Sequence, residues 1–325
     1  GDLNHVNMGC YTSMIRIKQL HQRLENELAR AEKMAAHAAT YGAKFDESAF
    51  RRAEEDLMFC EFHDILPGSC IQSAEEDAIV QLSHGIAEAE KIQLKAFFAL
   101  SGGQPKAESG EYPILVYNPH PFAVRRDVEC EFMLADQNWS EEEFYDVSVH
   151  CNGEKIPCQL EKESSNLPLD WRKKVVFFID MQPFSMNRVR VFTQRKPVRP
   201  RMLGDISDDL LFDNGELRVR ISAKTGLVES IEAGGKQYLE ESFSLQVIEN
   251  YCDPWGFHYD DYQKDLGAFR LLNEQESAAF AAVAKERLSP VRVIEDGEVR
   301  TVAESLFGYR SSRAAVRYIL PKKGT

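Results

Sequence analysis

The sequence lacks any run of apolar residues approaching the roughly 20 that a helix needs to cross a bilayer. It also lacks an excess of positive charge, because 52 acidic against 39 basic residues give a formal net charge of −13. An acidic surface repels polyanions, so we expect neither nucleic acid nor a membrane as a partner. A neutral substrate such as a glycan is compatible with this charge.

The sequence also lacks a cysteine pattern typical of disulfides or metal sites. The seven cysteines are an odd number, lie far apart along the chain and include no CxxC pair. This pattern favours reduced thiols and predicts a cytoplasmic protein. A secretion signal on a longer parent chain remains an open alternative.

The first 105 residues show the three- and four-residue apolar spacing of amphipathic helices. We predict one helix that begins at Thr12 or Ser13, as N-caps, and stops at Gly42. A second helix is predicted from Asp46 to a break at residues 66–68, where Leu-Pro-Gly cannot continue a helix.

A third helix is predicted to begin at a capping box, in which Ser73 and Glu76 would satisfy each other's backbone donors. Its buried stripe is predicted at Ala78, Leu82, Ile86, Ala89, Ile92 and Ala96. Three helices joined by short loops form an antiparallel bundle, which we assign to residues 1–105.

Beyond a Ser-Gly-Gly-Gln-Pro linker at residues 101–105, the apolar period changes from 3.6 to 2 and little helix is expected. Asn152-Gly153, between two alternating runs, predicts a hairpin. We assign residues 106–200 to a small immunoglobulin-like β-sandwich and residues 201–325 to a larger β domain. The predicted fold class is α+β with several domains. The strand-like run at the end predicts that this sheet continues in a longer protein, so we interpret the chain as a fragment.

An imidazole and a carboxylate, His63 and Asp64, stand where the second helix is predicted to break. An imidazole nitrogen is a good ligand for Zn²⁺, and a neighbouring carboxylate could ligate, orient the ring or bind a sugar hydroxyl. One histidine and one aspartate fall short of the three or four ligands that such a site needs. The alternative is that His63 caps the helix C-terminus and Asp64 begins a turn.

Residues 61–71, Glu-Phe-His-Asp-Ile-Leu-Pro-Gly-Ser-Cys-Ile, resemble the FHD-[IV]-L-P-G-[ST]-x-I signature of the middle domain of glycoside hydrolase family 38 α-mannosidases. Gly-Cys-Tyr-Thr-Ser at residues 9–13 and Val-Tyr-Asn-Pro at residues 116–119 are similar to family segments in the same order. Residues 217–226 look like the start of the family's C-terminal β-supersandwich, so residues 201–325 would be its truncated N-terminal part.

The resemblance implies specific roles for two residues. His63 would be a ligand of one divalent metal, Zn²⁺ by expectation, and Asp64 would bind the mannose of an α-mannoside oligosaccharide. The family's catalytic domain precedes the bundle, so the expected partner is a missing N-terminal domain in cis. No catalytic residue is assigned here, and the chain alone is expected to be inactive with an empty metal site.

Alternatives remain at three points. His258-Tyr259-Asp260 is a His-x-Asp match that could replace the missing metal pair, although its position in a polar loop favours solvated residues. The parent could be a mannosylglycerate-type hydrolase of the same family, or a non-catalytic carbohydrate-binding or docking module. A homo-oligomer is also left open.

Overall fold

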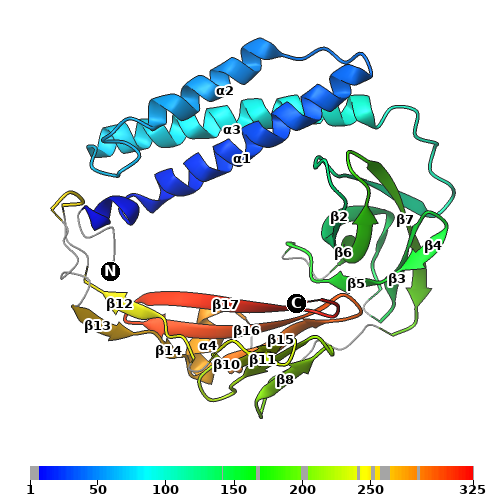
Figure 1. The fold of residues 1–325 in the computed structure, drawn as a ribbon. Helices are drawn as coiled ribbons and strands as arrows, with labels where there is room; N and C mark the ends of the chain where they lie inside the picture. Colours follow the sequence, from blue (N-terminus) through cyan, green and yellow to red (C-terminus); the bar gives the residue numbers. More distant parts are fainter. Residues whose placement is uncertain are drawn as a thin grey trace.

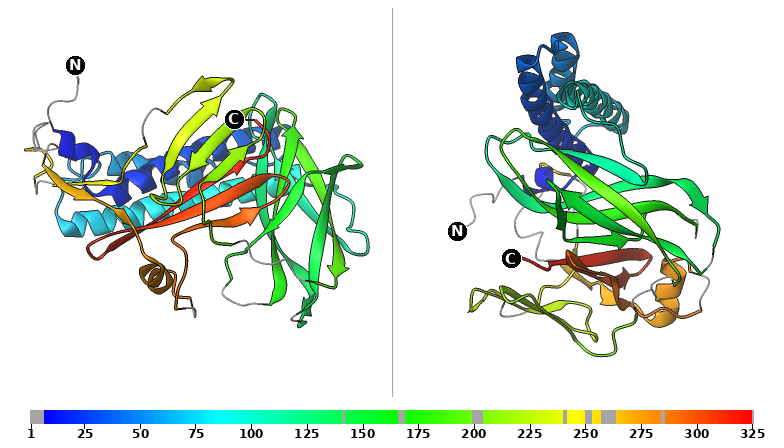
Figure 2. Two further views of the ribbon diagram at one scale, coloured as in Figure 1. Left: turned by 90° about the horizontal axis from the view of Figure 1, so that it is seen from below. Right: turned by 90° about the vertical axis from the view of Figure 1, so that its right-hand side faces the viewer.

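The computed structural model describes residues 7–140, 142–165, 169–198, 204–239, 242–249, 253–256, 264–283 and 286–324. These residues form a three-helix bundle, a small sandwich of two antiparallel sheets and a C-terminal group of antiparallel sheets (Figure 1). The right-hand view of Figure 2 shows the bundle above the small sandwich and the C-terminal sheets below it. The predicted α+β architecture is confirmed, whereas the boundaries at residues 105 and 200 stay predictions.

The bundle consists of α1 (Ile15–Thr40), α2 (Glu47–Cys60) and α3 (Gln72–Leu100). Leu24, Ala53 and Leu82 in its core have no exposed surface. All six members of the predicted α3 stripe are buried, so the periodicity correctly identified the packed face. None of the helices in the described ranges is long and apolar enough to cross a membrane.

Two of the predicted helix starts are wrong. The first helix begins after Met14, which makes no side-chain cap, and the Ser13 hydroxyl donates instead to the carbonyl of Pro67 at 2.7 Å. The third helix begins with Ile71 as N-cap, because the carbonyl of this residue accepts the first helical hydrogen bonds. Ser73 therefore lies inside the first turn, and its predicted capping box does not form.

The small sandwich packs two antiparallel sheets over one apolar core, in which Val149, Val175 and Phe177 are fully buried. The hairpin predicted at Asn152-Gly153 is present, with φ values of 51° and 85° that suit a type I′ turn. The first sheet contains β1 (Glu111–Tyr117), β7 (Met186–Lys196), β3 (Phe144–Cys151) and β4 (Glu154–Ile156), and the second contains β2 (Val124–Asn138), β6 (Asp170–Met181) and β5 (Cys158–Glu161).

The described residues of the C-terminal region form three further antiparallel sheets and one short helix. The helix, α4 (Glu274–Phe280), is not predicted from the sequence, and it starts at a capping box formed by Asn273 and Glu276. The sheets contain β11 (Lys236–Gln237), β10 (Val228–Ala233), β9 (Leu217–Ile221) and β8 (Leu210–Asp213); β12 (Gln246–Ile248) and β13 (Asp265–Ala268); and β14 (Arg270–Leu271), β16 (Arg300–Tyr309), β15 (Val291–Asp296) and β17 (Ser312–Pro321). In the last sheet, β16 is buried along nearly its whole length and pairs with β15 and β17.

Candidate functional site

The segment between α2 and α3 forms consecutive tight turns at one end of the bundle (Figure 1). The second helix ends at Cys60, before the predicted break at residues 66–68, because the amides of Glu61 and Phe62 bond to carbonyls three residues earlier. Pro67 then supplies no amide, and Gly68 takes a left-handed φ of 79°. The chain therefore reverses over residues 61–71.

His63 and Asp64 lie on the outside of this turn. The side chain of His63 is 72% exposed and that of Asp64 is 45% exposed. The Nε2 atom of His63 lies 3.5 Å from Oδ2 of Asp64, and its ring lies 4.2 Å from the Phe62 ring between centroids. Within the described residues no hydrogen bond joins His63 to a carbonyl of α2, so this geometry does not favour the helix-capping alternative.

Two serines fix the backbone beneath these side chains. The Ser69 amide donates to the carbonyl of Asp64 at 3.1 Å, and its hydroxyl donates to Oδ1 of the same residue at 3.3 Å. The Ser13 hydroxyl donates to the carbonyl of Pro67 at 2.7 Å. A Cβ atom added at Gly68 would lie 2.2 Å from Ser13 Oγ, so only glycine lets the two segments approach this closely.

A late loop reaches the same end of the bundle. The thiol of Cys10, in the 3₁₀-helix η1 (Met8–Tyr11), lies 3.6 Å from the carbonyl oxygen of Pro254. Trp255, next in that loop, is 42% exposed. The alternative metal pair that begins at His258 falls outside the residues that the structure describes.

Residues 5–100 match the family described as "Alpha mannosidase middle domain". The match includes all three helices of the bundle and the turn that carries His63 and Asp64. Residues 5–100 are thus similar to the middle domain of α-mannosidases. The resemblance drawn from residues 61–71 is therefore confirmed.

Two curated proteins similar to this chain are α-mannosidases. Over 81 residues the chain is 31% identical to the α-mannosidase of Saccharomyces cerevisiae. These residues cover 24% of this chain and 8% of the relative. Over 287 residues it is 26% identical to α-mannosidase G of Dictyostelium discoideum. This alignment covers 80% of this chain and 26% of the relative. The chain thus spans about a quarter or less of the length of these relatives.

Two solved structures share the fold well beyond the middle domain. They are an α-mannosidase from Enterococcus faecalis V583 and a protein in glycosyl hydrolase family 38 from Enterococcus faecalis. Both have a TM-score of 0.63 and cover 93% of this chain, at 13% and 14% sequence identity. The chain covers 35% and 37% of those structures. The chain therefore shares the fold of the corresponding part of these two structures.

His63 is an accessible imidazole at the end of the bundle. In the part of the chain that the structure describes, no group of three or more His, Cys, Asp or Glu side chains could hold a metal ion. Apart from its contact with Asp64 and the Phe62 ring, His63 makes no interaction among the described residues, so its ring has the residue type and the accessibility of a metal ligand.

The sequence identified His63 and Asp64 but not the residues that brace them. Ser13 was interpreted as a helix cap, and no role was assigned to Gly68 or Ser69. A signal for Gly68 was available, because glycine after proline at a helix break commonly takes a left-handed backbone. The partner of Ser13 lies 54 residues away and has no local signal.

Proposed function

We propose that the full-length protein hydrolyses α-mannosidic bonds with retention of configuration. In this proposal His63 supplies one ligand to a divalent metal, zinc by expectation, and Asp64 accepts hydrogen bonds from hydroxyl groups of the mannose. The metal, when bound, would hold vicinal hydroxyls of the sugar. The observation that carries the proposal is the exposed His63–Asp64 pair on a braced turn within a middle domain of this family.

Retention requires a carboxylate nucleophile and an acid/base carboxyl about 5 Å apart. We assign both groups to a separate domain of the same polypeptide, because the resemblance gives neither role to a residue of this chain. The bundle end then forms one wall of the active site. Its braced backbone keeps Asp64 in one position, which limits the entropy lost when the sugar is oriented.

Hydrolysis of an aryl α-mannoside by the full-length protein tests this proposal. We expect activity to disappear with a chelator and to return with added zinc, whereas residues 1–325 alone should give no turnover. A panel of α-mannobioses and mannosylglycerate identifies the preferred substrate. Turnover by residues 1–325, or full activity in chelator, would contradict the proposal. Glycan binding without hydrolysis by the full-length protein would instead support a non-catalytic module.

A further inference from the structure

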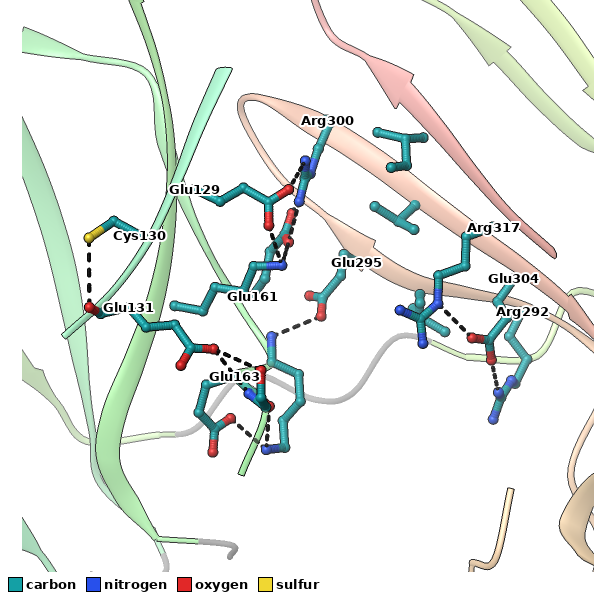
Figure 3. A pocket seen from close by; sticks show the side chains of 16 residues that line it. Glu129, Cys130, Glu131, Glu161, Glu163, Arg292, Glu295, Arg300, Glu304 and Arg317 are labelled. Atoms are coloured by element: carbon teal, nitrogen blue, oxygen red, sulfur yellow. Dashed lines mark hydrogen bonds and ion pairs between the residues drawn. The ribbon is translucent and has the colours of Figure 1, made fainter. Parts of the chain in front are cut away.

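A cavity of about 680 Å³ lies between the small sandwich and the C-terminal sheet. Its walls come from β2, β5 and β6 on one side and from β15, β16 and β17 on the other (Figure 3). Ligand pockets typically measure about 300–1,000 Å³ and occur preferentially at domain junctions. None of the residues of the proposed site around His63 lines this cavity.

Hydrogen bonds across the junction hold the cavity in shape before any ligand binds. Nε and Nη2 of Arg300 donate to the two carboxylate oxygens of Glu161 at 2.7 and 2.6 Å. Oε1 of Gln159 accepts the backbone amides of Val299 and Arg300, both at 2.9 Å. A preformed cavity loses less entropy on binding than one that must first be assembled.

Hydrogen-bond donors in the cavity are fixed by one buried carboxylate. Glu304 accepts from Nη2 of Arg292 at 2.5 Å and from Nε of Arg317 at 2.9 Å. The Arg317 side chain is 63% exposed, and no further hydrogen bond from it is found among the described residues. The outer nitrogens of this guanidinium are therefore available to a ligand, while its position is already fixed.

Acceptors stand beside these donors. Glu295, which lies between the Arg300 and Arg317 groups in Figure 3, accepts the Lys162 amide through Oε1 at 2.8 Å. Its Oε2 has no partner among the contacts of the described residues. A hydroxyl group can both accept from an arginine and donate to a carboxylate, so it matches this mixed lining.

Aliphatic side chains and a balance of charge complete the lining. Val302 and Ile319 are paired across β16 and β17, and Ile319 is 56% exposed. The lining also contains six carboxylates and five cationic side chains, for a formal net charge of −1. Such a cavity does not attract polyanions. Polar groups around an aliphatic surface match a sugar ring, which has hydroxyl edges and C–H faces.

We infer that this cavity binds a neutral oligosaccharide. Hydroxyl groups of the sugar accept hydrogen bonds from Arg317 and donate one to Glu295, and a C–H face packs on the exposed Ile319. The inference rests on the proposed function only for the choice of mannose as the sugar.

Calorimetric titration of the full-length protein with a hydrolysis-resistant, sulfur-linked α-mannotriose tests the inference. The titration uses His63→Ala protein, in which the proposed active site is disabled, so that one site should remain. Adding Arg317→Ala should weaken its Kd about tenfold or more, because a hydrogen bond to a charged group contributes about that much. Arg317→Lys, which keeps a charge beside Glu304, should fold normally and bind with intermediate affinity.

Arg270→Ala is the matched control. This arginine is also 63% exposed and paired with a carboxylate, Glu276 at 2.6 Å, but it does not line the cavity. Equal Kd values for Arg317→Ala and Arg270→Ala would overturn the inference. Inorganic phosphate that binds more tightly than the sugar and depends on Arg317 would overturn it in favour of an anion site. Aryl α-mannoside hydrolysis by the wild type reports the proposed function separately, so the two failures can be distinguished.

Discussion

The turn after α2 and the junction beside β16 are fixed in opposite ways. At the turn, hydrogen bonds brace the backbone, and the side chains of His63 and Asp64 stay exposed. At the junction the side chains themselves are tied, since Arg300 and Glu161 are 6% and 2% exposed and share two hydrogen bonds. The free side chains suit the ligand roles proposed for His63 and Asp64, whereas the buried Arg300–Glu161 pair fixes the contact between the small sandwich and the C-terminal sheet.

The largest effect on stability is expected at the junction. Arg300→Ala would leave Glu161 buried without its main partner, which costs about 3–5 kcal/mol of unfolding free energy. Arg125→Ala is the control, because it breaks a 3.1 Å pair with Asp180 in which both side chains are about two-thirds exposed, and such pairs contribute about 0–1 kcal/mol. If urea denaturation gave equal losses of unfolding free energy for the two variants, the buried pair at the junction would be no more important than an exposed pair.

The stability that the Arg300–Glu161 pair contributes should also depend on pH. Burial raises the pKa of Glu161, but hydrogen bonds from Arg300 and Lys174 outweigh this effect and hold the pKa below its ordinary value of 4.5. The resulting stabilisation is present above the unfolded-state pKa and is lost as pH falls through the lowered folded-state pKa. Unfolding free energy should therefore fall more steeply with acid in the wild type than in Arg300→Ala. Parallel pH profiles would show that Arg300 does not set this pKa.

At the turn, Gly68→Ala should lower the unfolding free energy more than Gly42→Ala does. Both glycines have a left-handed φ, 79° and 85°, so both variants pay about 1–2 kcal/mol of backbone strain. Only the new Cβ at Gly68 meets another segment, at Ser13, because open space surrounds Gly42. Such overpacking adds about 1–3 kcal/mol. If urea denaturation gives the same loss for both variants, the brace by Ser13 does not constrain the turn.

The smallest effects should separate two serines that the sequence predicted as helix caps. Ser13→Ala removes the hydrogen bond to Pro67 and should cost about 1 kcal/mol. Ser73→Ala should change the unfolding free energy by less than about 0.5 kcal/mol, because Ser73 caps nothing. A loss near 1 kcal/mol at Ser73, measured by thermal denaturation, would restore the predicted capping box.

Local patterns predicted the parts of the fold that local physics determines. The α3 stripe follows from the helical repeat, and Asn152-Gly153 follows from the positive φ values of its turn. The first helix start failed because Ser13 bonds to Pro67 in another segment, and the third failed because Ile71 takes the N-cap position before Ser73. The domain junction was not predicted at all, because Arg300 and Glu161 are 139 residues apart and neither belongs to a recognisable motif.

For the candidate site, the sequence identified the two residues, and the structure gave their exposure and the backbone contacts beneath them. The motif at residues 61–71 singled out His63 and Asp64. Their exposure depends on α2 ending at Cys60 and on the bond from Ser13 to Pro67, and neither can be read from apolar spacing.

Metal content and hydrolytic activity of full-length His63→Ala test the central claim most directly. The control is His84→Ala, because that imidazole also sits beside a carboxylate, with Nδ1 2.6 Å from Asp56 Oδ2, but lies on the side of the bundle. We predict that His63→Ala loses most of its bound divalent metal and at least about 100-fold of its activity, because even residues that only support a metal ligand affect metal affinity or activity by about 10–100-fold. His84→Ala should keep both its metal and its activity. Wild-type metal content and activity in His63→Ala would contradict the account.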